Sequence, residues 1–426
     1  MPNRDTTRPA GAAARAGGAP RGLWRDRDFV KVLAGETVSE LGSHVGGLAL
    51  PLAAVLALEA TPGQMAALRA AHYVPRILVG LVAGVWIDRL RRRPVMIATN
   101  LVRAALLLAV AVTAGLGLLR VELLYAAGLL MAVLGVVFGT AFAAYLPSLV
   151  PGRSLVAANG ARATSSAATE VLGPGLAGLL IQSLGVPGVI AIDGVSFLAS
   201  ALGLALVRTP EPAPPPPARR RRLQVELGEG MRALMGHPIL RAFLATAFTA
   251  QFFYSVIMAV YVVYLARELG LPPAALGVIF GLGGGVGVLA GSASAARVAR
   301  ALGLGRTLVG AHLLFGVLGL PLMLAVAWPA LAAPLVFAAE LTQLAANAVY
   351  MVNRVSVEQA VTPVHLRGRV QAGQTVAHAL SGALGLACGG ALGEGIGLSA
   401  AITVGVVGGL CSFLWLWCSP VRHLRW

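Results

Sequence analysis

The chain has 426 residues, of which 57% are hydrophobic and only 12% are charged, and it carries a formal net charge of +16. Soluble proteins carry about 25% charged residues, so this composition and a mean hydropathy of +0.80 exclude an ordinary soluble globular protein. The apolar residues are enough for about twelve membrane-spanning helices of ~20 residues each, and we therefore predict an all-α, polytopic membrane protein.

The chain begins with a segment, residues 1–27, that is rich in Ala, Gly and Arg. We expect it to be a disordered cytoplasmic tail, and we expect no cleavable signal peptide because no apolar run precedes Phe29. Twelve apolar segments follow. The predicted spans are 28–57, 64–87, 94–118, 121–149, 155–183, 186–207, 238–266, 273–296, 305–328, 331–360, 366–394 and 397–418.

A polar break over residues 208–237 separates the first six spans from the last six. Four consecutive prolines, 214–217, form a stiff extended piece, and four arginines, 219–222, hold it at the cytoplasmic membrane surface. Residues 225–235 have the pattern of a short amphipathic helix. The break predicts an N-terminal half at 28–207, a C-terminal half at 238–418 and a cytoplasmic tail at 419–426.

The two halves resemble each other at matched positions. Three pairs share one offset of 212 residues, and they are Pro151 with Pro363, Gly173 with Gly385, and Gly185 with Gly397. A constant offset supports a duplicated six-helix unit, which is the plan of many secondary transporters. Chance matches between apolar segments are the alternative.

The positive charges are distributed unevenly between the two sides of the predicted membrane. Most of the 33 lysines and arginines lie in the tails and in alternate loops, whereas Arg120 and Arg267 lie in the opposite loops. This asymmetry is the positive-inside pattern. It predicts a multi-pass protein of the inner or plasma membrane with both termini in the cytoplasm, and it accounts for the net charge without a nucleic-acid partner.

The turn from Gly84 to Pro94, between the second and third spans, holds one acid and four arginines. Unpaired charge is too costly to bury in a core, so this turn is a water-facing hinge between two spans. It resembles the loop signature between helices 2 and 3 of the major facilitator superfamily, Gly-x-Leu-Ala-Asp-Arg-x-Gly-Arg-Lys. The matching residues are Gly84, Asp88, Arg89, Arg92 and Arg93, and the departures are Trp86, Ile87 and Arg91.

Other segments resemble the same superfamily, and in particular the branch that contains macrolide-efflux and enterobactin-exporter proteins. They are residues 149–151 with 157–159, the helix around Gly173 and Pro174, residues 191–197, and the loop 363–370. The resemblance covers residues 28–418. It implies the major facilitator fold, with twelve transmembrane helices in two pseudo-symmetric halves, and a transporter rather than an enzyme.

The resemblance gives the hinge the role of a gate. It implies that Asp88, at the end of helix 2, meets the positive start of helix 11 near Leu366, with Arg367 and Arg369 as charged partners. Such a contact would hold the two halves together on the cytoplasmic side. The alternative is a basic loop that only sets the topology.

Gly173, Pro174 and Gly178 resemble the end of a motif associated with antiporters in this superfamily, although Ala177 departs from it and the upstream glycines are missing. Proline bends a helix and small residues admit close neighbours, so ordinary helix packing is the alternative. The arginine that the superfamily places deep in helix 4 is absent from residues 123–150. Any proton coupling must therefore use other groups.

Charges inside the predicted spans are costly unless they are paired or face a cavity. Glu36 and Glu40 lie one turn apart on one face of the first span, His44 follows one turn later, and Arg76 of the second span lies at a similar depth. We hypothesise that these groups, together with Glu170 of the fifth span, carry a coupled proton. A static ion pair between the first two helices is the alternative.

Helices 1, 4, 7 and 10 line the central cavity in the superfamily, which makes polar residues of the seventh and tenth spans candidates for substrate contact. They are Gln251, Tyr254, Glu340 and Asn347. Interfacial or core packing is the alternative for the tyrosine.

The sequence contains no pattern that points to a cofactor or a metal site. Gly283–Gly287 could be mistaken for a dinucleotide loop, but it lies inside an apolar span and fits a close-packing stripe that continues to Gly291. The one lysine, Lys31, is followed by Val32, which excludes a P-loop for ATP. We expect no cofactor, no bound metal and no disulfide framework.

These observations predict a secondary active transporter that exports small amphipathic molecules, such as drugs or siderophores, in exchange for protons. We expect a monomer in which the two halves alternate around a site at the membrane midplane. An importer or lipid flippase of the same fold is the alternative, and a non-transporting membrane scaffold or enzyme is a more distant one.

Overall fold

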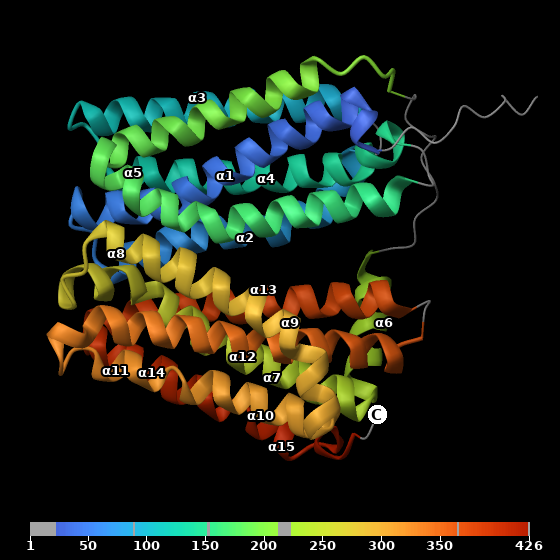
Figure 1. Cartoon of the computed structure of the whole chain (residues 1–426), viewed down its shortest axis with the longest axis vertical. Coiled ribbons are helices and arrows are strands. Elements are labelled where there is room, and N and C mark those ends of the chain that lie inside the picture. Colours follow the sequence, from blue (N-terminus) through green and yellow to red (C-terminus); the bar gives the residue numbers. More distant parts are fainter. Residues whose placement is uncertain (1–22, 88–89, 151–153, 212–222, 364–365, 425–426) are drawn as a thin grey trace, which may run out of the picture.

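The computed structural model describes residues 23–87, 90–150, 154–211, 223–363 and 366–424 (Figure 1). Within these ranges it contains helices and no strand, which confirms the predicted all-α fold class. The first main helices are α1 (Arg27–Leu56), α2 (Pro62–Ile87), α3 (Arg92–Gly115), α4 (Val121–Leu149) and α5 (Leu155–Ala205). They are followed by α6 (Leu223–Gly236), α7 (Pro238–Val263), α8 (Pro273–Val278), α9 (Gly285–Leu302), α10 (Leu304–Val317), α11 (Leu320–Leu324), α12 (Ala332–Val361), α13 (Arg367–Gly395), α14 (Leu398–Cys411) and α15 (Leu414–Trp417).

Ten helical stretches of the described chain are long and apolar enough to cross a membrane. One of them, Ala157–Ala205, contains Gly185, whose φ of 70° is a left-handed conformation that suits glycine. The helix is interrupted there, so α5 comprises two segments that match the predicted spans 155–183 and 186–207. With α5 counted twice and α2 added, the ten stretches correspond to the twelve predicted segments.

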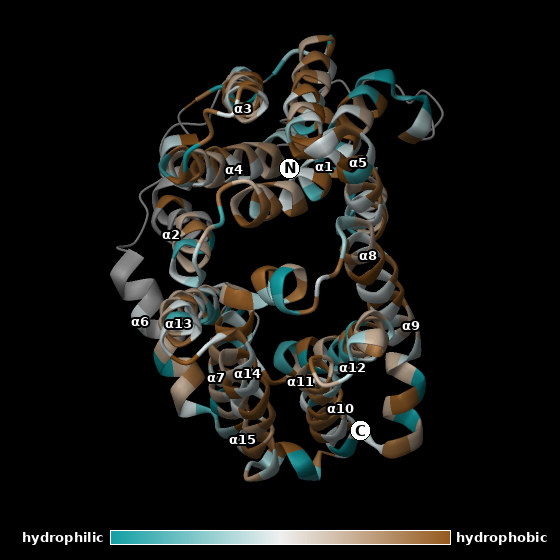
Figure 2. Cartoon of the chain, turned by 90° about the vertical axis from the view of Figure 1, so that its left-hand side faces the viewer, coloured by the Kyte–Doolittle hydropathy of each residue, from teal (hydrophilic) through white to brown (hydrophobic). Residues whose placement is uncertain are grey.

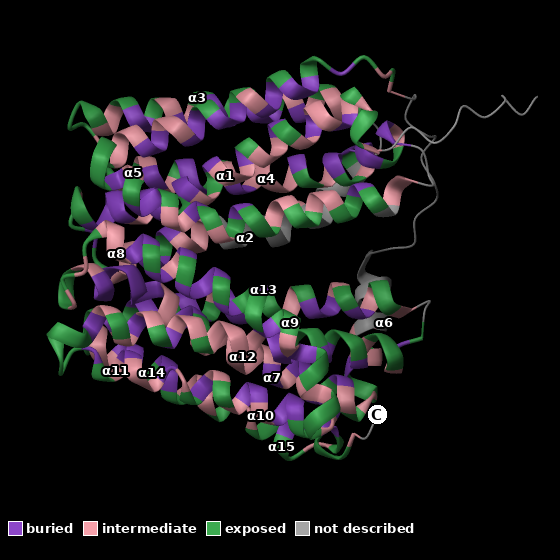
Figure 3. Ribbon diagram, viewed as in Figure 1, coloured by how far each residue is buried: buried purple, intermediate pink, exposed green. Residues whose placement is uncertain are grey.

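The outer surface of the protein is apolar, as the membrane requires. Large apolar side chains such as Leu129, Leu172, Leu289 and Trp415 are exposed. In Figure 3 exposed residues run along the full length of the helices and are not confined to their ends. A soluble monomer rarely exposes so much contiguous apolar surface, whereas a bilayer accepts it.

The helices form two groups (Figure 1). In the first, α1 and α3 pack against α5, and α2 and α3 against α4. In the second, α7 packs against α13 and α14, and α12 against α9 and α10. Figure 2 shows the two groups end-on, with α2 beside α13 on one flank and α5 beside α8 on the other.

Two charged side chains bind the helix ends on the side where the chain leaves α5, which we call the linker side. Glu211 accepts hydrogen bonds from the backbone N–H groups of Arg92 (2.5 Å) and Arg93 (3.1 Å) at the start of α3. The Arg93 guanidinium donates to the carbonyls of Leu204 (2.9 Å) and Ala205 (2.7 Å) at the end of α5. An acid at a helix start and a base at a helix end satisfy backbone groups that have no partner within the helix.

A second pair of charged residues anchors α1 in the same way. Asp28 accepts hydrogen bonds from the Lys31 ammonium (2.9 Å) and from the backbone N–H groups of Arg208 (2.9 Å) and Thr209 (2.8 Å). Lys31 also donates to the carbonyl of Leu206 at 2.8 Å. The first group of helices is therefore tied together at the linker side by its own polar contacts.

The two groups meet through glycines on the opposite side. A Cβ atom added to Gly178 of α5 would lie 2.7 Å from the Pro273 carbonyl oxygen and 2.9 Å from Cα of Gly277 in α8. One turn away, Gly281 approaches the backbone of Gly175 just as closely. In Figure 1 the two groups approach each other at this edge and diverge toward the linker side. The contact therefore depends on residues without side chains.

We predict that Gly178→Ala destabilises the protein because the added methyl group must push α5 away from α8. Overpacking of this kind costs about 1–3 kcal/mol and should lower the melting temperature of the purified protein in detergent. Gly160→Ala is the matched control in the same helix, because nothing lies within 4 Å of a Cβ at that position. Equal melting temperatures for the two variants would contradict this packing.

Candidate functional site

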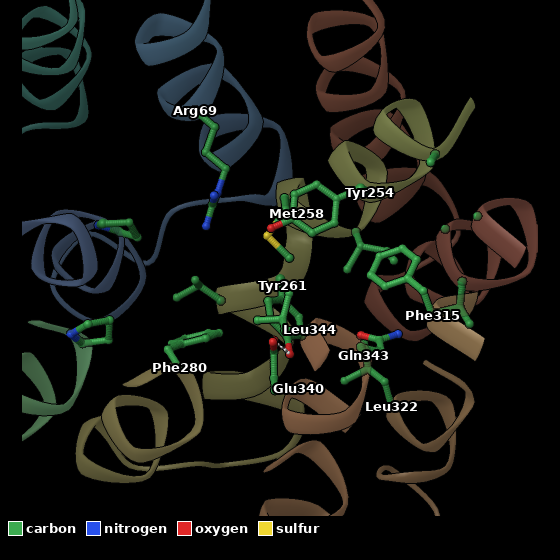
Figure 4. Close-up of a pocket in the computed structure, with 18 of the residues that line it drawn as sticks. Arg69, Tyr254, Met258, Tyr261, Phe280, Phe315, Leu322, Glu340, Gln343 and Leu344 are labelled. Atoms are coloured by element: carbon green, nitrogen blue, oxygen red, sulfur yellow. Dashed lines mark hydrogen bonds between the residues drawn. The ribbon is translucent and has the colours of Figure 1, made fainter. Parts of the chain in front are cut away.

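A cavity of about 390 Å³ lies between the two groups of helices. Its wall includes His44 and Pro51 of α1, Arg69 of α2, Tyr254 of α7 and Glu340 of α12. A neighbouring cavity of about 380 Å³ shares Pro51, Arg69 and Tyr254 with it. Figure 4 shows the labelled side chains of α2, α7 and α12 around the first cavity. Ligand sites in proteins are commonly of this size and mostly apolar, with a few polar groups.

Glu340 is the acid on the cavity wall, and its carboxylate accepts a hydrogen bond of 2.6 Å from the Tyr261 hydroxyl of α7. Tyr261 is 4% exposed, and its ring meets the edge of Phe280 at a centroid distance of 5.7 Å. The aromatic contact fixes the tyrosine, and the tyrosine orients the carboxylate (Figure 4). Glu340 is thus an oriented acidic group in an otherwise mainly apolar chamber.

The four predicted substrate-contact residues have different positions. Glu340 and Tyr254 line the first cavity, and Gln251 lines the second, where its amide donates to the Ser255 hydroxyl at 2.9 Å. Asn347 lines neither cavity. Gln343, one helical turn before Asn347, is on the wall in its place.

The acids predicted on the first span face a polar cluster inside the first group of helices. Glu40 accepts hydrogen bonds from the Ser166 hydroxyl of α5 at 2.8 and 2.7 Å to its two oxygens. Glu36 has Arg103 of α3 and Arg162 of α5 as described cationic neighbours. The side chain of Arg76, the partner predicted for Glu36 or Glu40, lies outside the described residues.

His44 and Glu170 are the remaining proton-coupling candidates with described side chains. His44 lines the first cavity, and its Cβ lies against Gly173 of α5. Glu170 is exposed on α5 and lines neither cavity.

Asp193 of α5 is a buried acid that the sequence reasoning missed. It is 4% exposed and interacts electrostatically with Arg103, which is 8% exposed. It also lies close to Ser43, a residue on the cavity wall. The guanidinium of Arg103 stacks over the Phe197 ring at 5.1 Å. The sequence does mark both residues, because Asp193 and Arg103 are charged residues inside predicted spans.

The space for Asp193 is provided by a glycine of α1. A Cβ atom on Gly46 would collide with the Asp193 carboxylate. The acid therefore sits directly against the α1 backbone, one turn from the residues that face the cavity.

The predicted gate is described only in part. Asp88 and Arg89 lie outside the described residues, as do the surroundings of Gly84. The hydrogen bonds of Arg92 and Arg93 described above stay within the first group of helices. Arg367 donates to the carbonyls of Thr362 (3.3 Å) and Gln359 (2.7 Å), which belong to its own group.

The antiporter-like motif lies where the two groups of helices meet. Gly173 contacts α1, Pro174 lines the cavity, and Gly178 packs on α8. Ordinary helix packing therefore accounts for Gly178, whereas Pro174 also lies on the cavity wall. Gly287 and Gly291 form the predicted close-packing stripe, because Cβ atoms there would meet the α12 backbone at Leu341 and Ala345.

Comparison with known proteins gives the following similarities. The model of the Major Facilitator Superfamily matches residues 33–353. The Uncharacterized MFS-type transporter YfiS of Bacillus subtilis (strain 168) is 26% identical over 398 residues, which cover 89% of each chain. Macrolide efflux protein A of Streptococcus pyogenes is 27% identical over 237 residues, which cover 55% of this chain and 57% of that protein.

Solved structures show the same fold. A bacterial homologue of the iron transporter ferroportin in its inward-facing state superposes with a TM-score of 0.75 at 20% identity, covering 93% of this chain and 99% of that one. A structure described as the outward-facing state of such a homologue gives a TM-score of 0.57, covering 92% and 98%. A point mutant of the nucleoside transporter NupG gives 0.71 at 11% identity, covering 92% and 99%.

We predict that Asp193→Ala and Arg103→Ala each destabilise the protein, because each removes one charge of a buried pair. The loss should be smaller for Asp193→Ala, since Arg103 keeps Glu36 as an acidic neighbour. Breaking a buried pair costs about 3–5 kcal/mol, and the melting temperature in detergent should fall accordingly. The double variant should cost much less than the sum of the two single variants. Additive losses would show that the two groups do not interact.

Proposed function

The chain belongs to the Major Facilitator Superfamily and is a membrane transporter of small molecules, not an enzyme, and on that premise we propose that it exports small amphipathic molecules in exchange for protons. The proposed mechanism is alternating access, in which the two groups of helices rock around the cavity. The observation that carries the proposal is an apolar chamber between the two groups that contains one oriented acid, Glu340.

The composition of the cavity wall supports an amphipathic substrate. Aromatic and aliphatic side chains such as Met258, Phe280 and Phe315 make up much of the surface. Such walls bind the apolar part of a ligand, and a few polar groups fix its orientation. Glu340 would attract a cationic group, and its bond to Tyr261 would hold the carboxylate toward that group. Arg69 on the same wall would suit an anionic group, as in a siderophore or a lipid headgroup.

The arrangement of the two groups of helices supports alternating access. The groups contact each other on the side opposite the linker and diverge on the linker side (Figure 1). If the positive-inside pattern sets the topology, the linker side faces the cytoplasm, with both termini there and the cavity accessible from within the cell. The higher TM-score against the inward-facing structure agrees with this orientation of the groups.

Two observations favour export over import. One is the similarity to Macrolide efflux protein A over about half of the chain. The other is the antiporter-like segment at Gly173, Pro174 and Gly178, which joins the cavity wall to the contact between the groups. An exporter must load its cargo from the cytoplasm or inner leaflet, and the two groups of helices diverge on the linker side, which the proposed topology places in the cytoplasm (Figure 1).

The acids inside the first group of helices are our candidates for proton coupling. Glu36 and Glu40 remain candidates, and Asp193 joins them because it lies close to Ser43 on the cavity wall. His44 is on that wall itself. Arg103 and Arg162 lie near enough to respond when an acid gains or loses a proton. We further propose that the protein works as a monomer in the cell membrane.

Transport by inverted membrane vesicles tests the direction and the coupling. We expect vesicles that contain the protein to accumulate a cationic dye when their interior is acidic, because protons leaving the lumen would drive the dye inward. Replacing Glu36 and Glu40 together by Gln should abolish this pH-driven accumulation. Glu59→Gln, an exposed loop substitution, is the matched control. Coupled transport by the double variant would exclude these two acids, and accumulation only under the opposite gradient would favour an importer.

We predict that Glu340→Gln weakens the binding of cationic compounds by roughly tenfold or more, because it removes a charged hydrogen-bond acceptor. Tyr261→Phe should have a smaller effect, since the carboxylate stays but loses its orientation. Dye binding to purified protein, followed by fluorescence polarisation, would measure both. Asn347→Ala is the control, because Asn347 lines neither cavity. An equal loss of affinity for neutral compounds would argue against a charge-based role for Glu340.

A further inference from the structure

A capping box begins α2 on the side opposite the linker. The Thr61 hydroxyl accepts from the backbone N–H of Gln64 at 3.2 Å, and the Gln64 side chain accepts from the backbone N–H of Thr61 at 2.9 Å. Pro62, which has no N–H group, occupies the first helical position. This reciprocal arrangement satisfies two backbone donors of the helix start within the helix itself. The N–H group of Gly63 is left for another partner.

That partner is Glu394, at the end of α13 in the other group of helices. One oxygen of its carboxylate accepts hydrogen bonds from the Thr61 hydroxyl (2.8 Å) and from the backbone N–H of Gly63 (3.1 Å). The carboxylate therefore sits at the positive end of a helix that belongs to the opposite half of the molecule. We call this contact the Glu394 clasp.

Close packing holds the clasp in position. Cβ atoms on Gly390 and Gly393 of α13 would collide with Ala66 and Pro62 of α2, respectively. A Cβ atom on Gly63 would collide with the Glu394 carboxylate. Three glycines therefore allow the close approach of the two helix ends. Because α2 and α13 belong to different halves, this approach exists only when the halves are closed on this side.

We propose that Glu394 is the residue that locks the transporter closed on the side opposite the linker and that the clasp must break whenever that side opens. This inference rests on the alternating-access cycle proposed above. When the halves part, both donors lose the carboxylate, which therefore stabilises one conformation and not the other.

The clasp mirrors the gate predicted at the other end of the same helix pair. The family resemblance implies that Asp88, at the end of α2, meets the start of α13 on the linker side. Glu394, at the end of α13, meets the start of α2 on the opposite side. With the gate that the resemblance implies, each helix would end in an acid that meets the start of its partner, and the two contacts would form in opposite conformations.

The second flank closes by a different kind of contact. There α5 and α8 meet through Gly178 and Gly277, and Gln182 stands at the position that the offset of 212 residues pairs with Glu394. Another polar contact between the halves on this side runs from the Arg267 guanidinium to the Val55 carbonyl at 3.0 Å. The charge-based lock is therefore assigned to the α2–α13 flank.

Distance measurements between spin labels on the two halves test the proposal without any substrate. In a background in which Cys388, Cys411 and Cys418 are replaced by Ala, Leu118→Cys and Ala330→Cys report on the clasp side. Asn159→Cys and Arg300→Cys report on the linker side in a second labelled protein. All four positions are exposed, and the protein is measured in proteoliposomes.

Glu394→Gln should increase the population with a long distance on the clasp side by about threefold, as loss of a charge at a helix start would do. The linker-side pair should shift toward shorter distances. Thr61→Val should act in the same direction. The effect of the Thr61→Val/Glu394→Gln double variant should exceed the larger single effect only slightly, because both substitutions remove the same interaction. Gly63→Ala should displace the carboxylate sterically and also favour opening. Glu122→Gln, an exposed acid in the first turn of α4 on the same side, is the matched control.

If the distances in the Glu394→Gln protein change no more than those in the Glu122→Gln protein, the proposed role of the Glu394 clasp is wrong. If the wild-type protein populates two states at both label pairs in that case, alternating access survives and only the role of Glu394 is wrong. If one population persists at both pairs in every variant, the clasp and the proposed cycle are both wrong.

Discussion

The backbone groups of a membrane-spanning helix pair within the helix, except at its ends, where free N–H and C=O groups need side chains or water as partners. In this chain charged side chains are partners of several helix ends. Glu211 satisfies the start of α3, and Arg93 satisfies the end of α5. Both contacts lie within one half and make it rigid. The same physics acts between the halves at Glu394, where it stabilises a conformation instead of a fold.

The buried charges divide into two sets. Asp193, Arg103 and Glu36 lie inside the first half, where aromatic rings and small residues surround them. Glu340 lies on the wall between the halves and has a neutral partner, Tyr261. A proton or a substrate could change the charge of either set. Ser43 lies close to Asp193 and on the wall of the cavity that Glu340 also lines.

The fold was largely predictable because each membrane-spanning helix requires a long apolar segment, which is visible in the hydropathy of the sequence. The spans and the break at Gly185 follow from apolar runs and from a glycine that takes a positive φ. Glu340 and Tyr254, which were predicted as polar residues of spans seven and ten, lie on the wall of the first cavity. Asn347 lies seven residues, or about 10 Å, beyond Glu340 along α12 and lines neither cavity. Asp193 was not predicted as a site residue, because the acid of the sixth span was assigned no role. No pattern in one helix could reveal Glu394, whose partners lie more than 300 positions away in the chain.

Accumulation of compounds by cells tests the central claim that this protein moves amphipathic molecules outward. Cells that lack their own efflux pumps would be loaded with a panel of cationic, neutral and anionic amphipathic compounds, with and without the chain. The account predicts that cells producing the chain retain less of at least one class, and that collapsing the proton gradient removes the difference. Equal or greater retention of every class in those cells would contradict export.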